Sequence, residues 1–124
     1  MKRNDAYRSV LIIEDDDDIR DGLRQLLEAE GYIVDAAQDG REGLALAAQS
    51  SPPRVILLDL MMPTMNGWEF LEARRKDPRL AKVPVVVVSA TGHPARLGEV
   101  TAFFRKPVDV ERLLEVVHHF ATPS

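Results

Sequence analysis

Residues 10–23 read VLIIEDDDDIRDGL, a short apolar run followed by a row of acids and then by the start of a helical pattern. The apolar run at 10–13 lacks polar alternation and is rich in branched aliphatic residues, as expected of a strand buried on both faces of a sheet. Runs of the same kind occur at 55–58 and 85–88. Together they predict the centre of a parallel sheet.

Segments with helical spacing separate these strands. Ile19, Leu23 and Leu27 recur at intervals of four residues, which predicts a surface helix that ends near Gly31. Further helices are expected at 42–49, 67–76 and 110–120, and two weaker strands at 32–36 and 102–105. Alternating strands and helices with right-handed crossovers predict a doubly wound α/β fold around a five-stranded parallel sheet.

The composition is that of one domain without covalent cross-links. The chain has 124 residues, 45% of them hydrophobic, so we expect a single domain over 1–124 with its core at about 8–121. Cysteine is absent, which excludes a disulfide framework and a Cys-based zinc site. No apolar run approaches the roughly 18 residues of a membrane span, and the start of the chain lacks the apolar stretch of a signal peptide. We therefore expect no membrane partner and a cytoplasmic location.

The net charge of −4 is concentrated in one place. Glu14–Asp18 contribute five acids in a row, whereas the remaining charges nearly cancel. Such a distribution gives no basic footprint for nucleic acid, and it predicts a cation as the ligand of the acidic stretch. The row could also be only a solvated helix start, because acids favour the first turn through capping and the helix dipole. We favour that second interpretation for Asp17 and Asp18.

Polar residues stand where the predicted strands end. Glu14 and Asp15 follow the first strand, Asp59 follows the third, Ser89 ends the fourth, and Lys106 follows the fifth. Ligands of open α/β sheets bind at the carboxyl ends of the strands, so we expect these side chains to meet there. Carboxylates that converge repel one another unless a hard divalent cation lies among them, and oxygen ligands of this kind suit Mg²⁺.

Four segments carry a family resemblance: VLIIEDDDDIRDGL, VILLDLMMPTMNGWEFL, VPVVVVSATG and FFRKPVD. In this order and at strand ends, they resemble the motifs of bacterial response-regulator receiver domains, of the chemotaxis-type single-domain kind, and the resemblance covers nearly the whole chain. It implies a flavodoxin-like (β/α)5 fold and a role in a two-component phosphorelay. A sensor histidine kinase or phosphotransfer protein would be the phosphodonor, and an unknown downstream protein would receive the signal. No enzyme activity is implied beyond the chain's own phosphorylation and dephosphorylation.

The resemblance assigns the metal and phosphoacceptor roles to particular residues. It implies that Asp59 accepts the phosphoryl group. It implies that Mg²⁺ is bound by Asp15 directly, by Glu14 through water, by Asp59 and by the main-chain carbonyl of Met61. The family more often has Asp at the position of Glu14, so we expect a modest change in Mg²⁺ affinity without loss of the site.

The resemblance also assigns the switch. Lys106 and the Ser89 hydroxyl are implied to neutralise the phosphoryl oxygens, and Phe103 is implied to rotate inward with Ser89 on activation. Strand alternation places Phe104 on the opposite face, where we expect a core residue. A cis peptide is implied between Lys106 and Pro107, as X-Pro bonds tolerate.

One interval departs from the family pattern. Ser89 and Lys106 are 17 positions apart, with Pro94 and Gly98 between them, so the fourth helix of the family is expected to be short, irregular or missing. That departure keeps a second hypothesis open, a receiver-like interaction domain that does not use phosphorylation. A third, a hydrolase with Asp59 as nucleophile, is disfavoured because Met61 stands where a general acid is needed. We expect a monomer or a weak dimer.

Overall fold

Five parallel strands and four helices form the computed structural model, which describes residues 9–49, 51–62, 64–90 and 100–121. The strands are β1 (Ser9–Ile13), β2 (Ile33–Ala37), β3 (Val55–Leu58), β4 (Val85–Ser89) and β5 (Ala102–Arg105). The helices are α1 (Asp17–Ala29), α2 (Gly40–Ala48), α3 (Gly67–Arg75) and α4 (Val110–Ala121). The strand order is β2-β1-β3-β4-β5, with every neighbouring pair parallel. The predicted doubly wound, flavodoxin-like fold is confirmed.

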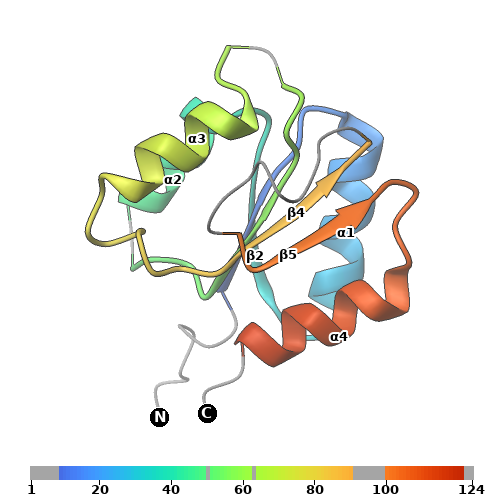
Figure 1. Cartoon of the computed structure of the whole chain (residues 1–124). Coiled ribbons are helices and arrows are strands. Elements are labelled where there is room, and N and C mark those ends of the chain that lie inside the picture. Colours follow the sequence, from blue (N-terminus) through green and yellow to red (C-terminus); the bar gives the residue numbers. More distant parts are fainter. Residues whose placement is uncertain (1–8, 50, 63, 91–99, 122–124) are drawn as a thin grey trace, which may run out of the picture.

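Helices cover both faces of the sheet, with α2 and α3 on one side and α1 and α4 on the other (Figure 1). Alternate residues of β1 therefore enter different cores. Leu11 and Ile13 pack on the α2 and α3 side with Phe70, whereas Val10 and Ile12 pack on the α1 and α4 side. Burial on both faces explains why the central strands have no polar alternation.

Side-chain caps fix where the helices begin. The Asp16 carboxylate accepts the amide of Ile19 at 2.9 Å and caps α1, so Asp17 and Asp18 lie in its first turn. The helix-start interpretation of Asp17 and Asp18 is thereby confirmed. Asn66 caps α3 reciprocally with Glu69, since each side chain accepts the other residue's amide at 2.9 Å. Such caps satisfy amides that would otherwise lack partners and fix the first turn of each helix.

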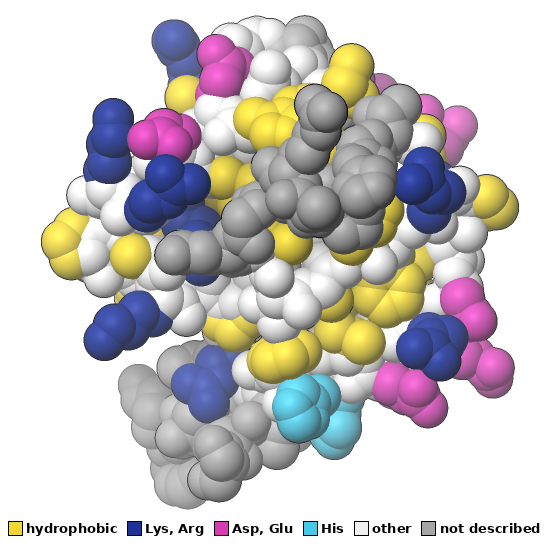
Figure 2. All heavy atoms as spheres, in the orientation of Figure 1, with side chains coloured by type: hydrophobic (Ala, Val, Ile, Leu, Met, Phe, Trp, Pro, Cys, Tyr) yellow, Lys and Arg dark blue, Asp and Glu magenta, His cyan; other side chains and the backbone are white. Residues whose placement is uncertain are grey.

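Charged side chains are unevenly distributed over the face in Figure 2. Basic side chains gather around α3 and the loop after it, where Arg75, Lys76 and Lys82 are exposed, and acidic and histidine side chains lie near α4.

Among the described helices, none combines the length and the apolarity needed to cross a membrane. The short or irregular fourth helix that we expect between Ser89 and Lys106 falls largely on 91–99, outside the described residues.

Candidate functional site

The residues that follow the strands are held at one edge of the sheet by main-chain hydrogen bonds. Three of them donate their amide hydrogens to the last residue of a neighbouring strand. These pairs are Glu14 with Ala37 at 3.0 Å, Asp59 with Ile13 at 2.9 Å, and Lys106 with Ser89 at 3.0 Å. Each bond extends a parallel ladder by one residue beyond the strand. The parallel register thus carries all five residues predicted at the strand ends to the same edge, Asp15 by following Glu14 directly.

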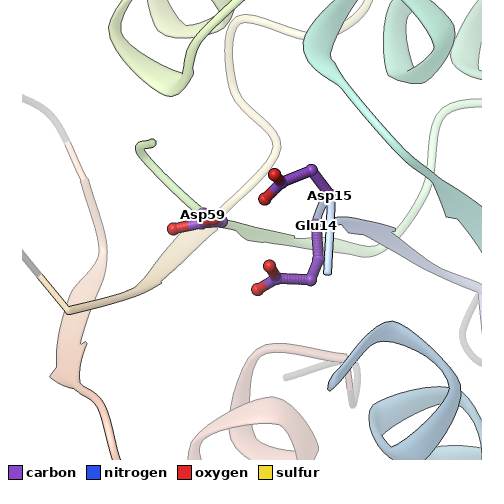
Figure 3. Close-up of side chains that lie close together, drawn as sticks. All are labelled: Glu14, Asp15 and Asp59. Atoms are coloured by element: carbon purple, nitrogen blue, oxygen red, sulfur yellow. The ribbon is translucent and has the colours of Figure 1, made fainter. Parts of the chain in front are cut away.

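Three carboxylates converge there. Glu14 and Asp15 follow β1, Asp59 follows β3, and their carboxylates point to the same side (Figure 3). One oxygen of each lies within 4.8 Å of the others, a spacing that could hold a metal ion. Glu14 is 2% exposed and Asp59 is 5% exposed, whereas Asp15 is open to solvent. The site is therefore a buried pair of acids with one accessible acid at its mouth.

Lys106 supplies the positive charge of the site. Its Nζ lies 2.8 Å from Oε1 of Glu14 and 3.9 Å from Oδ1 of Asp59, and its side chain is 19% exposed. The other oxygen of Glu14 accepts the amide of Asp16 at 3.1 Å. Sequence reasoning placed Lys106 at the site without foreseeing that Glu14 would be its nearer partner.

Burial works against the charged form of both inner acids. Desolvation raises the pKa of Glu14, and the hydrogen bonds from Lys106 and from the Asp16 amide oppose that rise only in part. Desolvation also raises the pKa of Asp59, against the charge of Lys106 and the amide of Met61. One cation thus compensates two buried carboxylates incompletely. A donor set made only of carboxylate oxygens suits a hard cation, and the residues present fit Mg²⁺ in this respect.

The chain after Asp59 turns sharply beneath it. The Met61 amide lies 3.4 Å from Oδ1 of Asp59, and the Met61 side chain is 56% exposed. Gly67 donates its amide to Leu60 at 2.9 Å and packs so closely that a Cβ atom there would lie 2.7 Å from the carbonyl oxygen of Asp59. Glycine at this position therefore permits the start of α3 to approach the phosphoacceptor candidate. The Met61 carbonyl remains a predicted ligand.

The predicted switch residues lie on the strands next to β3. Ser89 is fully buried at the end of β4, and its carbonyl accepts the amide of Lys106. Phe103 packs toward the α2 and α3 core with the Arg105 guanidinium 5.7 Å from its ring, so these two share a face. Phe104 packs against the opposite core, as predicted, and is half-buried there. The predicted cis peptide before Pro107 is confirmed.

Two features of the site were not predicted from the sequence. Arg20 of α1 folds back over the loop between β1 and α1 and binds its main chain. An apolar groove of about 540 Å³ opens beside Lys106, between α1 and the segment after β5. Its lining residues are Ile19, Leu23, Val88, Lys106, Pro107 and Val108. A hydrogen bond from an arginine to main-chain oxygens has no sequence signature, and a groove between distant segments requires the topology.

Comparisons with known proteins agree with this geometry. A family model described as the response regulator receiver domain matches residues 10–118. The chain is 32% identical over 118 residues to the polar-differentiation response regulator DivK of Brucella anthropi, covering 91% of this chain and 95% of DivK. It is 38% identical over 110 residues to the DNA-binding dual master transcriptional regulator RpaA of Synechocystis sp., covering 85% of this chain but only 45% of RpaA.

Solved structures give the same result. A crystal structure of the chemotaxis protein CheY4 of Vibrio cholerae superposes with a TM-score of 0.81 at 32% sequence identity, covering 90% of this chain and 96% of CheY4. The family match spans most of the chain, and both the strand order and the acidic cluster at the strand ends accord with it. The chain therefore belongs to the response regulator receiver domain family of two-component signalling.

Proposed function

We propose that this chain is a phosphoacceptor switch of a two-component phosphorelay, in which Asp59 takes up a phosphoryl group beside Mg²⁺. The observation that carries the proposal is the convergence of two buried acids, one exposed acid and one lysine at the carboxyl edge of the sheet. Burying carboxylates around a single cation is costly, and such an arrangement is expected where function requires it.

Asp15, Glu14, Asp59 and the carbonyl of Met61 would hold the metal. Glu14 is engaged with Lys106 and the Asp16 amide, which favours contact through water over direct ligation. Asp15 is exposed at the mouth of the site and is the better direct ligand. Bound Mg²⁺ supplies positive charge against the phosphoryl oxygens.

Phosphoryl transfer needs only alignment and charge compensation from the chain. A carboxylate oxygen of Asp59 attacks the phosphorus of a phosphohistidine, the P–N bond breaks, and its electron pair remains on the imidazole nitrogen, which then takes a proton. Lys106 Nζ lies 3.9 Å from Oδ1 of Asp59, close enough to neutralise one phosphoryl oxygen after a small side-chain rotation. The Ser89 hydroxyl would bind a second phosphoryl oxygen. The chain assists its own phosphorylation and dephosphorylation and turns over no other substrate.

The acyl phosphate would signal by redistributing charge. It adds negative charge and acceptor oxygens beside Lys106, which then has a partner that competes with Glu14. Ser89 would move toward the phosphoryl group, and Phe103, half-buried on the neighbouring strand, would follow it inward. A downstream protein would recognise the altered surface.

The phosphodonor in this proposal is a sensor histidine kinase or a phosphotransfer protein. Its docking surface would include the apolar groove beside Lys106, which joins the α1 surface to the edge where Asp59 lies. An apolar groove next to a charged site suits a partner that must bring its own reactive histidine to Asp59.

Mass spectrometry of the intact protein tests the proposal. We expect the wild type to gain the mass of one phosphoryl group when incubated with acetyl phosphate and Mg²⁺, and we expect chelation or Asp59→Asn to abolish the gain. Asp35→Asn is the matched control, because Asp35 is an exposed acid within β2, away from the strand ends. No gain in the wild type, with acetyl phosphate or a phosphorylated partner, would favour the interaction domain that does not use phosphorylation.

A further inference from the structure

Arg20 holds the main chain of the loop that presents the two acids after β1. Its Nη1 donates to the carbonyl of Glu14 at 2.9 Å and lies 3.4 Å from the carbonyl of Asp15. Its Nη2 pairs with the Asp17 carboxylate. The Arg20 side chain is 18% exposed and its bond to the Glu14 carbonyl is partly buried, whereas Asp17 is 81% exposed. One guanidinium thus joins the first turn of α1 to both peptide groups that flank the Asp15 side chain.

The rest of this loop is fixed on its other side. The Glu14 amide donates to Ala37 at the end of β2 at 3.0 Å, and the Asp16 amide donates to the Glu14 side chain at 3.1 Å. The Asp15 carboxylate, in contrast, has no hydrogen-bond partner in the part of the chain that the structure describes. Its direction is therefore set by its own backbone, and Arg20 holds the carbonyl side of that backbone.

We propose that Arg20 is a positioning residue that sets the affinity and the selectivity of the site for Mg²⁺ by orienting Asp15. The inference rests on the proposed metal site and adds a residue that touches neither metal nor phosphoryl group. Mg²⁺ requires nearly ideal octahedral geometry, whereas Ca²⁺ tolerates variable ligand positions. A loop held on both sides favours the more demanding ion, and a released loop loses that preference.

The positive charge of Arg20 and its hydrogen bonds to the loop predict opposite effects on Mg²⁺ affinity when the residue is replaced. A guanidinium near a cation site repels the cation, so removing its charge alone would strengthen Mg²⁺ binding. Removing its hydrogen bonds to the carbonyls lets the Asp15 peptide rotate, which weakens Mg²⁺ binding, and loss of such outer contacts typically costs about 10-fold or more. Arg20→Lys keeps the charge but loses the fork of donors, and Arg20→Met loses both.

Titration of the chelator-treated protein with MgCl₂ and separately with CaCl₂, followed by amide NMR, measures both affinities. Arg24 provides the matched control, because it lies one turn later on α1, is exposed, and makes no recorded contact with the loop. We expect Arg20→Lys and Arg20→Met to weaken Mg²⁺ binding about 10-fold and Ca²⁺ binding by less than about 3-fold. Arg24→Lys and Arg24→Met should leave the ratio of the two affinities unchanged.

Three results would overturn the inference. One is unchanged Mg²⁺ affinity in Arg20→Lys, and a second is strengthened binding in Arg20→Met to the same extent as in Arg24→Met, which would leave only a charge effect. The third is equal weakening for both ions. If the wild type binds no Mg²⁺ and Asp15→Asn changes nothing, the metal site of the proposed function fails and takes the inference with it. Thermal unfolding in chelator, measured alongside, separates lost affinity from lost folding.

Discussion

Lys106 Nζ lies 2.8 Å from Oε1 of Glu14, and this ion pair joins the ends of two strands that are not neighbours in the sheet. β3 and β4 lie between β1 and β5, so the lysine side chain reaches across the site to its partner. Asp59, at the end of β3, is the more distant acid at 3.9 Å. The Lys106 ammonium is therefore paired mainly with Glu14, and the proposed phosphoryl transfer to Asp59 would have to draw it away.

Replacing Lys106 should destabilise the folded protein, because Glu14 and Asp59 would then be buried without a counter-charge. In Lys106→Met the apolar stem remains, but Glu14 and Asp59 lose their compensating charge, so the free energy of unfolding at pH 7 in chelator should fall by about 2 kcal/mol. The loss should shrink as pH falls, because a protonated carboxyl needs no counter-charge. Urea unfolding at several pH values measures this. Lys82→Met is the control, because Lys82 is exposed and has no ion pair with any residue that the structure describes. Equal effects of the two variants would contradict the assigned role of the ion pair.

Asp59→Asn should stabilise the metal-free protein at neutral pH. Burial raises the pKa of Asp59 above its ordinary value of 3.8, so the folded state binds the proton more tightly than the unfolded state does. The stabilisation from this protonation is fully present below the pKa of Asp59 in the unfolded chain. It is lost as pH rises through the higher pKa of Asp59 in the folded protein. At pH 7 the buried carboxylate of Asp59 is a cost to the folded state, and the neutral amide of Asp59→Asn removes it. The free energy of unfolding at pH 7 in chelator should therefore rise by an amount on the order of 1 kcal/mol. Chemical denaturation with and without Mg²⁺ tests this, and destabilisation in chelator would count against it.

Gly67 and Gly22 form a matched pair for testing the turn beneath Asp59. A Cβ at residue 67 would lie 2.7 Å from the Asp59 carbonyl, whereas nothing lies within 4 Å of one at residue 22. Gly67→Ala should lose about 2 kcal/mol of stability and also weaken Mg²⁺ binding, because the main chain of the site must move. Gly22→Ala, inside α1, should gain about 0.5–1 kcal/mol and leave the site intact. Thermal unfolding and Mg²⁺ titration of both variants measure these effects; normal Mg²⁺ affinity in Gly67→Ala would refute the structural link.

Mg²⁺ binding should weaken in mild acid more than expected for carboxylates with ordinary pKa values. Burial raises the pKa of Glu14 and Asp59 above 4.5 and 3.8, so protons compete with the metal closer to neutrality. We expect Mg²⁺ affinity to begin to fall at a higher pH than it would for carboxylates with pKa values of 4.5 and 3.8, with a shallower fall in Glu14→Gln. Titration by calorimetry or amide NMR at several pH values measures the onset and the slope. A wild-type affinity that begins to fall only at the pH expected for those ordinary values would contradict the raised pKa values.

The strand ends were predictable from sequence, because buried strands and a parallel sheet bring residues that are remote in the chain to one edge. Asp59, Lys106 and the acids after β1 were identified in this way. Which acid pairs with Lys106 was not predictable, since it depends on side-chain reach across two intervening strands. The loop contacts of Arg20 were missed because a hydrogen bond from an arginine to main-chain oxygens has no sequence signature. The face of Phe104 was predicted correctly from strand alternation, but how fully it is covered was not, because alternation does not show how far a helix extends over a strand.

In the proposed function, the acids gathered at the carboxyl edge of the sheet allow the carboxylate of Asp59, and no other, to become an acyl phosphate. Borohydride reduction after incubation with acetyl phosphate and Mg²⁺ is the sharpest test, because it converts a phosphorylated aspartate to homoserine. Peptide mass spectrometry should then find homoserine at position 59 alone, and none in chelated samples. Homoserine at position 15 or elsewhere, or none at all beside a measured phosphoryl gain, would contradict the account.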